Sequence, residues 1–558
     1  MMSIFSRVPK TKVPSSNHNL SFEKKMSMNF GTLVPTICEE VLPGDRMKVS
    51  TELLIKFAPL KAPVMHRLKA KIDYFFVPEF QISQVFQDFI NPKVNTDQNP
   101  VVLPYLEAKD LMKNLPGYGT EGFTPKGSLL DYLGLPILNN GLWTSNKRIS
   151  VRPMMAYQHI YNSFYRDQNL EPLEGANPAS TSLFMVDEFL DSTGNLGQSS
   201  SNQLKNLLTL RSRAWKKDYF TSALPSPQAG EDVMIPLSSG WNKVYPLRYN
   251  GEGELEDDDY IRFDSGVGIS GSHTASFVPD EHGETNKSHL TDGPNNSFIP
   301  TNLYAQSPVS DLSVNLFRQL IQLQGFKEIA ARGGTRYPEV VRNFFNAYLP
   351  DYWFGRPLFL GGQVQPINIG EVVQTSQSTD GESGSAQGYR AGIASSYGFT
   401  KTFKLKAPCH GFLMGLLTII PEATYQQGLE RMWTRESLYD FAFPQFANLG
   451  EQEILNQEIY ADGSENDTKV FGYAPRYAEY KEGHTMVCGE FRDSLDYWHF
   501  GRVFATRPKL NKKFVMMDQM DYSPFNVTDA QTEHVYVDLY NNIHSRRPLP
   551  YFSRPATL

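Results

Sequence analysis

The feature of this sequence that most constrains its fold is an alternation of apolar and polar residues near both ends of the chain. Between Met47 and Phe57 every second residue is apolar or a threonine, and most of the residues between them are charged or polar. Val535, Val537 and Leu539 repeat this pattern near the C-terminus. Because successive side chains of a strand point to opposite faces, both segments are predicted to be strands with one buried face. Strands at both ends favour one large β-sandwich with long insertions over a string of independent domains.

Other segments indicate how the middle of the chain contributes to this sandwich. Residues 72–77 are a short aromatic run closed by Pro78, and residues 411–420 are apolar on both faces. A strand with one solvated face would alternate, so 411–420 is predicted to be a central strand covered on both sides. Three low-complexity stretches are predicted to be loops, namely residues 192–202, 251–299 and 374–397.

Helices are predicted inside the insertions. Residues 82–90 place their apolar side chains on one helical face, which ends before Pro92. Pro153 is well placed to open a second helix. A third helix begins at Ser310 or Asp311 as its N-cap and runs to Gly333, which provides a C-terminal stop.

Composition bounds the class of protein. The 41 glycines, 37 prolines and 13% aromatic residues favour short strands with long connections, and 40% hydrophobic residues are enough for a substantial core. Cys38, Cys409 and Cys488 are too few and too far apart for a disulfide framework, so we expect buried thiols in a reducing cytoplasm. The N-terminus lacks the apolar core of a signal peptide, and no run approaches the roughly 18 apolar residues that span a bilayer. We therefore expect no secretion and no membrane insertion.

Charge is distributed unevenly along the chain. The net charge is −7, but residues 251–299 hold eleven acidic and two basic residues, a net −9, which leaves +2 for the remainder. This acidic island is rich in Gly, Ser, Asn and His and is predicted to be exposed to solvent. The two ends of the chain are modestly basic, which suits contact with a polyanion.

No motif for catalysis or cofactor binding stands out. Residues 266–271 match GxGxxG, but they lack the preceding buried strand and the following helix that a dinucleotide site needs. Asp462, Ser464, Asn466 and Asp467 loosely resemble a calcium loop, but its central glycine and terminal glutamate are absent at the required spacing. A solvated turn is therefore favoured, and weak calcium binding is the alternative. Cys409 and His410 are adjacent at a strand start and point to opposite faces, a poor arrangement for a nucleophile and its base. We predict no enzymatic activity, no cofactor and no metal site.

Residues 424–499 are dense in aromatic and amide side chains and contain the runs YQQGL, RMWTR, FANLGEQEI, NQEIY, VFGYAPRYAEYK and LDYWH. Further segments include ICEEVLPGDRMKV (37–49), KDYFTSALPSPQAG (217–230), LGGQVQPINIGEVVQTSQS (360–378) and PLPYFSRP (548–555). These segments resemble, in the same order, the gokushovirus-type major capsid proteins of the Microviridae. The resemblance covers nearly the whole chain except about 171–205 and 236–306.

The resemblance implies a mainly β fold, the viral jelly-roll β-sandwich with long, partly helical loop insertions. It also implies that copies of the chain self-assemble into a small T=1 icosahedral shell enclosing circular single-stranded DNA. On this basis we expect residues 1–235 and 307–558 to form a single jelly-roll domain with insertions. Residues 1–25 would form a basic N-terminal arm, and residues 236–306 an acidic surface insertion.

The resemblance further implies a place in the virion, with synthesis and assembly in the bacterial host cytoplasm. The expected partners are other copies of the chain, the packaged DNA, a small basic DNA-packaging protein and a host surface receptor. In this family an insertion forms a protrusion at the threefold axes that is implicated in host attachment, and we assign residues 236–306 to it. The candidate DNA contacts are Arg7, Lys10, Lys12, Lys24, Lys25, Arg546, Arg547 and Arg554, and the candidate attachment residues are Glu254, Asp257, Asp258, Asp259, His273, His282 and His289.

Two other classes of protein share this composition. A β-rich carbohydrate-active enzyme or lectin-like binder would show a cleft with a close pair of carboxylates and would act as a monomer. A phage spike or adhesin would form trimers without closed shells. The capsid interpretation predicts higher assemblies and no turnover.

Overall fold

The structure of the chain is a computed structural model. It describes residues 13–552, with the exception of residues 84, 92–99, 122, 139, 172–200, 231–243, 250–254, 258–261, 266–272, 275–297, 301–302, 306–313, 335, 349, 351–354, 374, 376–387, 389, 484, 519 and 530–531. The chain divides into two compact units, of which one comprises Met1–Ala229 with Glu328–Leu558 and the other comprises Gly230–Lys327.

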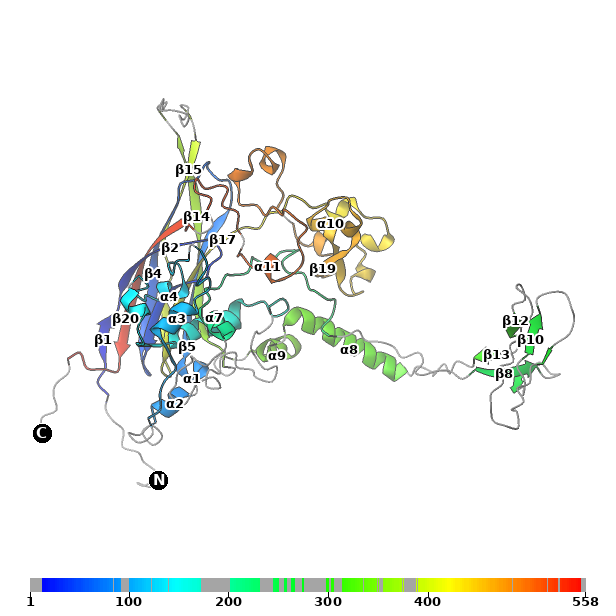
Figure 1. Ribbon diagram of the computed structural model, residues 1–558, viewed down its shortest axis with the longest axis horizontal. Helices are drawn as coiled ribbons and strands as arrows, with labels where there is room; N and C mark the ends of the chain where they lie inside the picture. Colours follow the sequence, from blue (N-terminus) through cyan, green and yellow to red (C-terminus); the bar gives the residue numbers. More distant parts are fainter. Residues whose placement is uncertain are drawn as a thin grey trace, which may run out of the picture. The chain divides into compact units, whose positions relative to one another are not determined.

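A single ten-stranded antiparallel sheet forms the frame of the larger unit (Figure 1). Its first half has the strand order β2–β20–β4–β15, so that strands from the two ends of the chain lie side by side. Two short strands, β1 and β16, extend this half by pairing with β20 and β4. The bounds are β1 (Ser16–Asn19), β2 (Phe22–Met28), β4 (Arg46–Phe57), β15 (Arg390–Phe399), β16 (Phe403–Lys406) and β20 (Val535–Arg547).

The second half of the sheet has the order β14–β5–β17–β3. Its strands are β3 (Val34–Val41), β5 (Leu68–Pro78), β14 (Leu358–Val373) and β17 (Gly411–Pro421). The long strand β14 joins the halves, because its first part pairs with β5 and its last part pairs with β15. Two sets of four antiparallel strands in this order, built from strands distant in sequence, make the predicted jelly-roll sandwich.

The two halves of the sheet enclose the main hydrophobic core. The predicted alternation in β4 is confirmed, since every second residue from Met47 to Phe57 is buried. The prediction for 411–420 is also confirmed: Leu413 and Leu417 of β17 lie in the main core, while Met414 lies in a second core on the opposite face. Each such aliphatic side chain contributes about 1.5–3 kcal/mol on burial.

The connection between β5 and β14 carries the helical insertion that forms the second core. The elements of this insertion in the larger unit are α1 (Glu79–Ile82), α2 (Val85–Phe89), β6 (Tyr105–Glu107), α3 (Ala108–Lys113), α4 (Leu129–Tyr132), α5 (Asn140–Trp143), β7 (Arg148–Ser150), α6 (Arg152–Ile160), a π-helix (Tyr161–Tyr165), α7 (Ser201–Leu208) and α9 (Tyr337–Phe345). Residues from α3, α4, α6 and α7 pack in the second core with the outer face of β17. The strand β17 and the second part of β5 are therefore covered on both faces, whereas β14 keeps an exposed face.

The helix predictions have mixed outcomes. The helix opened by Pro153 is confirmed as α6. The single helix predicted for residues 82–90 is wrong, because Ser83 is extended (φ −151°, ψ 121°) and separates α1 from α2. The third helix, α8 (Val314–Gly333), ends at the predicted Gly333, whereas its predicted caps Ser310 and Asp311 lie outside the described residues.

Residues Gly230–Lys327 form the smaller unit. Its described strands are β8 (Val244–Tyr249), β9 (Leu255–Asp257), β10 (Arg262–Ser265), β11 (His273–Thr274), β12 (Phe298–Pro300) and β13 (Leu303–Ala305), in two three-stranded sheets. Short strands therefore interrupt the predicted loop at 251–299. The loop predicted at 374–397 is also wrong in its second part, because β15 begins at Arg390.

The connection between β17 and β20, residues 422–534, is the other long insertion. It contains β18 (Gln452–Leu455), α10 (Asn456–Ile459), β19 (Val470–Ala474) and α11 (Lys512–Val515), separated by short 3₁₀ turns. Strands β18 and β19 form a two-stranded antiparallel sheet. This insertion includes the aromatic segment 424–499.

Candidate functional site

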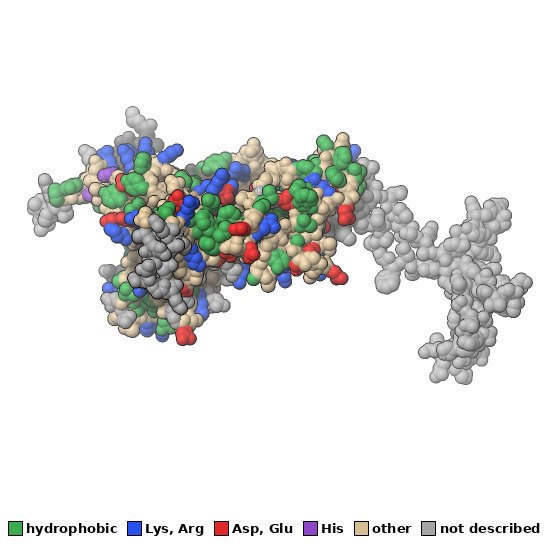
Figure 2. All heavy atoms as spheres, turned by 90° about the horizontal axis from the view of Figure 1, so that it is seen from above, with side chains coloured by type: hydrophobic (Ala, Val, Ile, Leu, Met, Phe, Trp, Pro, Cys, Tyr) green, Lys and Arg blue, Asp and Glu red, His purple; other side chains and the backbone are tan. Residues whose placement is uncertain are grey.

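The insertion at 422–534 exposes many large apolar side chains. We define the apolar surface as the exposed residues Leu429, Met432, Trp433, Leu438, Tyr439, Phe441, Phe443, Leu449, Val470, Tyr480 and Met486. Hydrophobic side chains reach the surface at the end of the described body that carries α10 and β19 (Figures 1 and 2). Large exposed apolar patches of soluble proteins mark interaction sites, because they remain costly to hydrate until a partner covers them.

A small, separate hydrophobic core supports the segments that carry the apolar surface. Ile454, Ile459 and Phe471 pack there with aromatic residues that include Phe220 and Phe514. These residues come from three parts of the chain, so the exposed turns rest on a fixed base. The apolar surface is therefore preformed, which lowers the entropy lost when a partner covers it.

Glu458 anchors the base of the apolar surface. Its carboxylate accepts hydrogen bonds from the Tyr219 hydroxyl (2.8 Å) and the Leu455 backbone amide (2.8 Å), and it lies 3.5 Å from the Arg431 guanidinium. Burial raises the pKa of Glu458, and these polar contacts oppose that rise. The backbone at Gly428 passes so close that an added Cβ would lie 1.9 Å from the Glu458 carbonyl oxygen. Only glycine fits at this crossing.

The calcium-like turn at 462–467 is held by an arginine. The Arg507 guanidinium donates to Asp462 (2.5 Å) and to Asp467, which puts a positive charge between the two carboxylates. The predicted solvated turn is therefore tied down by a side chain from the same insertion. Across the described residues, no group of three or more His, Cys, Asp or Glu side chains could hold a metal ion.

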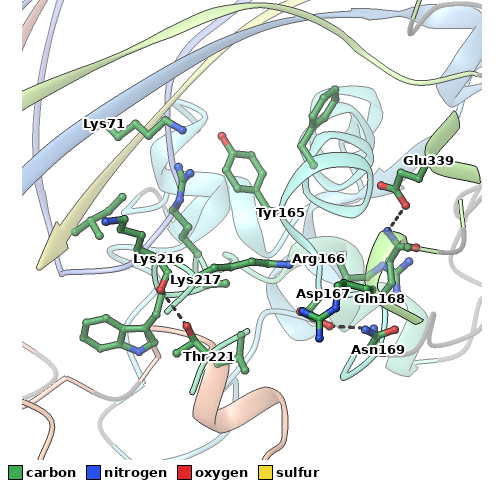
Figure 3. Close-up of a pocket in the computed structure, with 18 of the residues that line it drawn as sticks. Lys71, Tyr165, Arg166, Asp167, Gln168, Asn169, Lys216, Lys217, Thr221 and Glu339 are labelled. Atoms are coloured by element: carbon green, nitrogen blue, oxygen red, sulfur yellow. Dashed lines mark hydrogen bonds between the residues drawn. The ribbon is translucent and has the colours of Figure 1, made fainter. Parts of the chain in front are cut away.

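A charged pocket of about 710 Å³ lies where several segments of the larger unit meet. Its walls come from β5, the π-helix, residues 213–217 and the residues around α9 (Figure 3). The lining cations are Lys69, Lys71, Arg166, Arg213, Lys216, Lys217, Arg332 and Arg336. No sequence signal pointed to this pocket, because its residues are spread from position 69 to position 515.

Most of the lining cations are paired with carboxylates. Asp73 accepts the Tyr165 hydroxyl (2.8 Å) and pairs with Arg213 (3.2 Å) and Lys71 (3.5 Å). Glu422 pairs with both Lys69 (3.5 Å) and Lys216 (3.6 Å). The described residues that line the pocket include no Ser, Cys or His. This arrangement stabilises the junction of the segments.

The predicted cysteine properties are partly wrong. Cys38 and Cys409 are partly buried, and burial raises the pKa of the Cys38 thiol to about 12. Cys488 is exposed, contrary to the expectation of three buried thiols. Cys409 and His410 immediately precede β17.

The basic ends of the chain meet at one edge of the sheet. Ser16 in β1 pairs with Arg547 in β20, which brings the segments after residue 12 and before residue 548 side by side. Lys25 is exposed and pairs with Glu23 (2.6 Å), and Arg546 is exposed and donates to the Ser15 hydroxyl (3.2 Å). Four of the predicted DNA contacts, Arg7, Lys10, Lys12 and Arg554, lie outside the described residues.

Two other candidate DNA contacts have structural partners. The Lys24 ammonium donates to the carbonyls of Pro35 (2.8 Å) and Tyr132 (2.5 Å), and burial lowers its pKa to about 8. Arg547 pairs with the fully buried Asp45 (3.2 Å). Both side chains are thus committed to the sandwich itself.

The candidate attachment residues fall in the smaller unit. Asp257 ends β9 and His273 begins β11. Glu254, Asp258, Asp259, His282 and His289 lie outside the described residues, as does the GxGxxG stretch at 266–271.

Comparison with known proteins gives a consistent result. The family model described as Capsid protein (F protein) matches residues 6–557. The chain is similar to the capsid protein VP1 of Chlamydia phage 1, with 32% identity over 610 residues that cover 100% of this chain and 98% of the relative. The VP1 proteins of Bdellovibrio phage phiMH2K (30% identity, 99% and 97% covered) and Spiroplasma virus 4 (28% identity, 99% and 97% covered) are also similar. Among the described helices, none combines the length and the apolar character needed to cross a membrane.

Proposed function

This chain belongs to the Capsid protein (F protein) family and is a gokushovirus-type capsid protein of the virion, and from that premise we propose that its copies close into a T=1 icosahedral shell around circular single-stranded DNA. The role of the family is structural. Assembly in the host cytoplasm belongs to the same proposal.

The proposal of a closed shell is supported most by the exposed side chains of the apolar surface, which lies within residues 424–499. A single subunit leaves Trp433, Tyr439 and Phe441 exposed on a preformed base, and such residues are typical of the buried centres of protein interfaces. A subunit of a closed shell meets neighbours around several symmetry axes, so it needs more than one such contact. Long insertions on a jelly-roll frame provide the area for these contacts.

The basic ends of the chain are the proposed inward contacts to DNA. The strands next to these ends, β1 and β20, are paired, with Asn17 opposite Arg546. The other proposed contacts are Arg7, Lys10, Lys12 and Arg554. Neutralising phosphates with such side chains releases counterions and gives binding that depends on salt. A small basic DNA-packaging protein is the proposed source of the remaining positive charge.

Residues 236–306 are the proposed attachment insertion at the threefold axes. They contain the whole acidic island and fall within the smaller unit Gly230–Lys327. A separate unit can vary in sequence without disturbing the sandwich, which suits contact with a changing host receptor.

Electron microscopy of the purified protein, and of particles that carry it, tests the proposed function. Closed shells of T=1 size are expected. Trimers without shells would favour a spike or adhesin. A stable monomer that hydrolyses glycans would favour the carbohydrate-active enzyme. Either of these outcomes would overturn the proposal.

A further inference from the structure

The first half of the sheet has one bare face. In β4 and β20 the residues alternate between buried and exposed or partly exposed, whereas in β17 of the second half nearly every residue is buried. The exposed set points away from the main core. We define the bare face as the outward residues of β20, β4, β15 and β16. No described element of the larger unit contributes a second core on this side of the first half.

Strand register gathers five cations and the imidazole of His544 into two adjacent rows on the bare face. The first row is Arg546, Arg46 and Lys406, and the second row is His544, Lys48 and Lys404. All six side chains are exposed. The rows are about 6.6 Å apart along a strand, and neighbours within a row are about 4.8 Å apart at the backbone.

These rows do not stabilise the subunit. Within the described part of the chain, no carboxylate lies within 4.0 Å of the charged groups of Arg46, Lys48, Lys404 or Lys406. Like charges directly opposite each other on a sheet are destabilising. The rows therefore cost folding free energy, and an anionic partner would offset that cost.

Aromatic side chains follow the cations along the same face. The strand β15 has an inverted pattern, with the small residues Ala394 and Ser396 inward, while Tyr397 and Phe399 are 70% and 71% exposed. Inward space is tight, since a Cβ at Gly392 would lie 2.2 Å from the Ala62 carbonyl oxygen. The outward rings bury little area in the subunit, so folding alone does not explain them.

The rings lie beside the cationic rows in register. Phe399 is paired with Glu52 of β4, and Glu52 is paired on its other side with Tyr540 of β20, a further exposed ring. Tyr397 is paired with Leu54. From Lys48 to Glu52 is four residues, about 13 Å along the strand. Cations and rings thus lie within the reach of a few nucleotides.

We propose that the bare face binds single-stranded DNA, with the two cationic rows on backbone phosphates and with Tyr397, Phe399 and Tyr540 stacked on unpaired bases. The inference rests on the proposed function, because it names a second surface through which the shell contacts its genome. Positive grooves combined with aromatic rings are the usual means of binding single strands without sequence preference. Two copies facing each other by this surface would bring like charges together, and a duplex would offer no free base faces.

The charge component is tested by salt titration of binding. The full chain is compared with a variant carrying Arg46→Gln, Lys48→Gln, Lys404→Gln and Lys406→Gln by fluorescence anisotropy with a labelled oligothymidylate. Loss of four phosphate contacts should reduce the slope of log K against log salt by about 3, from about 0.7 per contact. A control with the same charge change at exposed lysines carries Lys126→Gln, Lys147→Gln, Lys469→Gln and Lys509→Gln, and it should keep the wild-type slope.

The stacking component is tested separately. Tyr397→Ala and Phe399→Ala should each weaken oligothymidylate binding by about fivefold or more, while Tyr397→Phe should bind as the wild type does. Both positions are exposed, so the subunit should remain folded, as circular dichroism would show. A duplex of equal length should compete poorly, and equal competition by the duplex would contradict base stacking.

The outcomes separate this inference from the proposed function. A wild-type slope and affinity in the bare-face glutamine variant would overturn the inference, even if electron microscopy shows closed shells. A glutamine variant that binds DNA normally but fails to assemble would assign the bare face to a second copy of the chain and would also overturn it. A wild-type protein that binds oligothymidylate through this face but forms no shells would count against the proposed function alone.

Discussion

Truncation of Trp433 provides the sharpest test of the apolar surface. The indole is 69% exposed in the subunit, and a tryptophan can bury up to about 250 Å², so about 170 Å² remains for a partner to cover. At about 25 cal/mol per Å² this area is worth at most about 4 kcal/mol. Trp433→Ala is therefore expected to weaken each contact it enters by about 2–4 kcal/mol, or roughly 30-fold to 1000-fold in the association constant.

The assay is the subunit concentration at which particles form, followed by light scattering and analytical ultracentrifugation. Trp433→Phe is the matched control, because it keeps a large ring at the same position and should shift that concentration far less. The folded subunit should be nearly unaffected in both variants, since exposed substitutions usually change stability by less than about 0.5 kcal/mol. Thermal unfolding of unassembled subunits checks this point.

Leu438, which is 61% exposed on the same surface, supplies an independent second position. If Trp433→Ala and Leu438→Ala both leave a folded subunit that assembles at the wild-type concentration, the apolar surface is not a subunit contact. The exposed apolar area would then not drive shell assembly.

Three further predictions concern the sandwich and the insertion. The pKa of Lys24 is about 8 in the folded chain and 10.5 in the reference state, so the unfolded chain binds more protons between these values. The free energy of unfolding should therefore rise with pH across that window, by up to about 3 kcal/mol relative to Lys24→Met. Urea unfolding at pH 7 and at pH 10.5 measures this rise. Arg547→Gln leaves the buried Asp45 carboxylate without its cation and should lower the free energy of unfolding in urea by about 3–5 kcal/mol. Arg546→Gln, at the neighbouring exposed position, should lower it by less than about 0.5 kcal/mol. Equal losses would contradict the structural role of Arg547. Removal of residues 251–299 should leave particles that assemble but adsorb poorly to host cells, and normal adsorption would refute the attachment proposal.

The strands of the sandwich could be predicted where one face is exposed to solvent and the other is buried. In β4 the alternation from Met47 to Phe57 matches the observed burial residue by residue. In β17 a second core covers the outer face, and the continuous apolar run signalled that cover. Both patterns depend only on which side chains are buried, so both can be predicted from a single sequence.

The strand β15 could not be predicted from its apolar pattern, because that pattern is inverted. Its inward positions include Gly392 and Ala394, and the large rings of Tyr397 and Phe399 face solvent. The predicted loop 374–397 overlaps the start of β15, and its small and polar residues gave no sign of a strand there. The separation of α1 from α2 at Ser83 was equally hidden, because the apolar spacing continues across the break.

The charged pocket escaped prediction for a topological reason. Lys71, Arg213 and Glu422 are far apart in sequence, and they come together only because β5, the segment after α7 and the end of β17 meet at one place. No local spacing encodes such a meeting. The candidate DNA contacts were chosen from charge alone. Charge does not distinguish the exposed Lys25 from Lys24, whose ammonium donates hydrogen bonds to two backbone carbonyls.

The distribution of polar and apolar groups bears on the choice between a capsid subunit and an enzyme. A catalytic cleft needs polar groups left available to a substrate. In the charged pocket the Glu422 carboxylate is paired with two lining cations, and two further lining cations are paired with Asp73. The larger uncovered groups of the described chain include exposed rings around Trp433 and cations on the bare face. Uncovered groups on several surfaces suit the proposed shell, in which neighbouring copies of the chain and a polyanion would cover them.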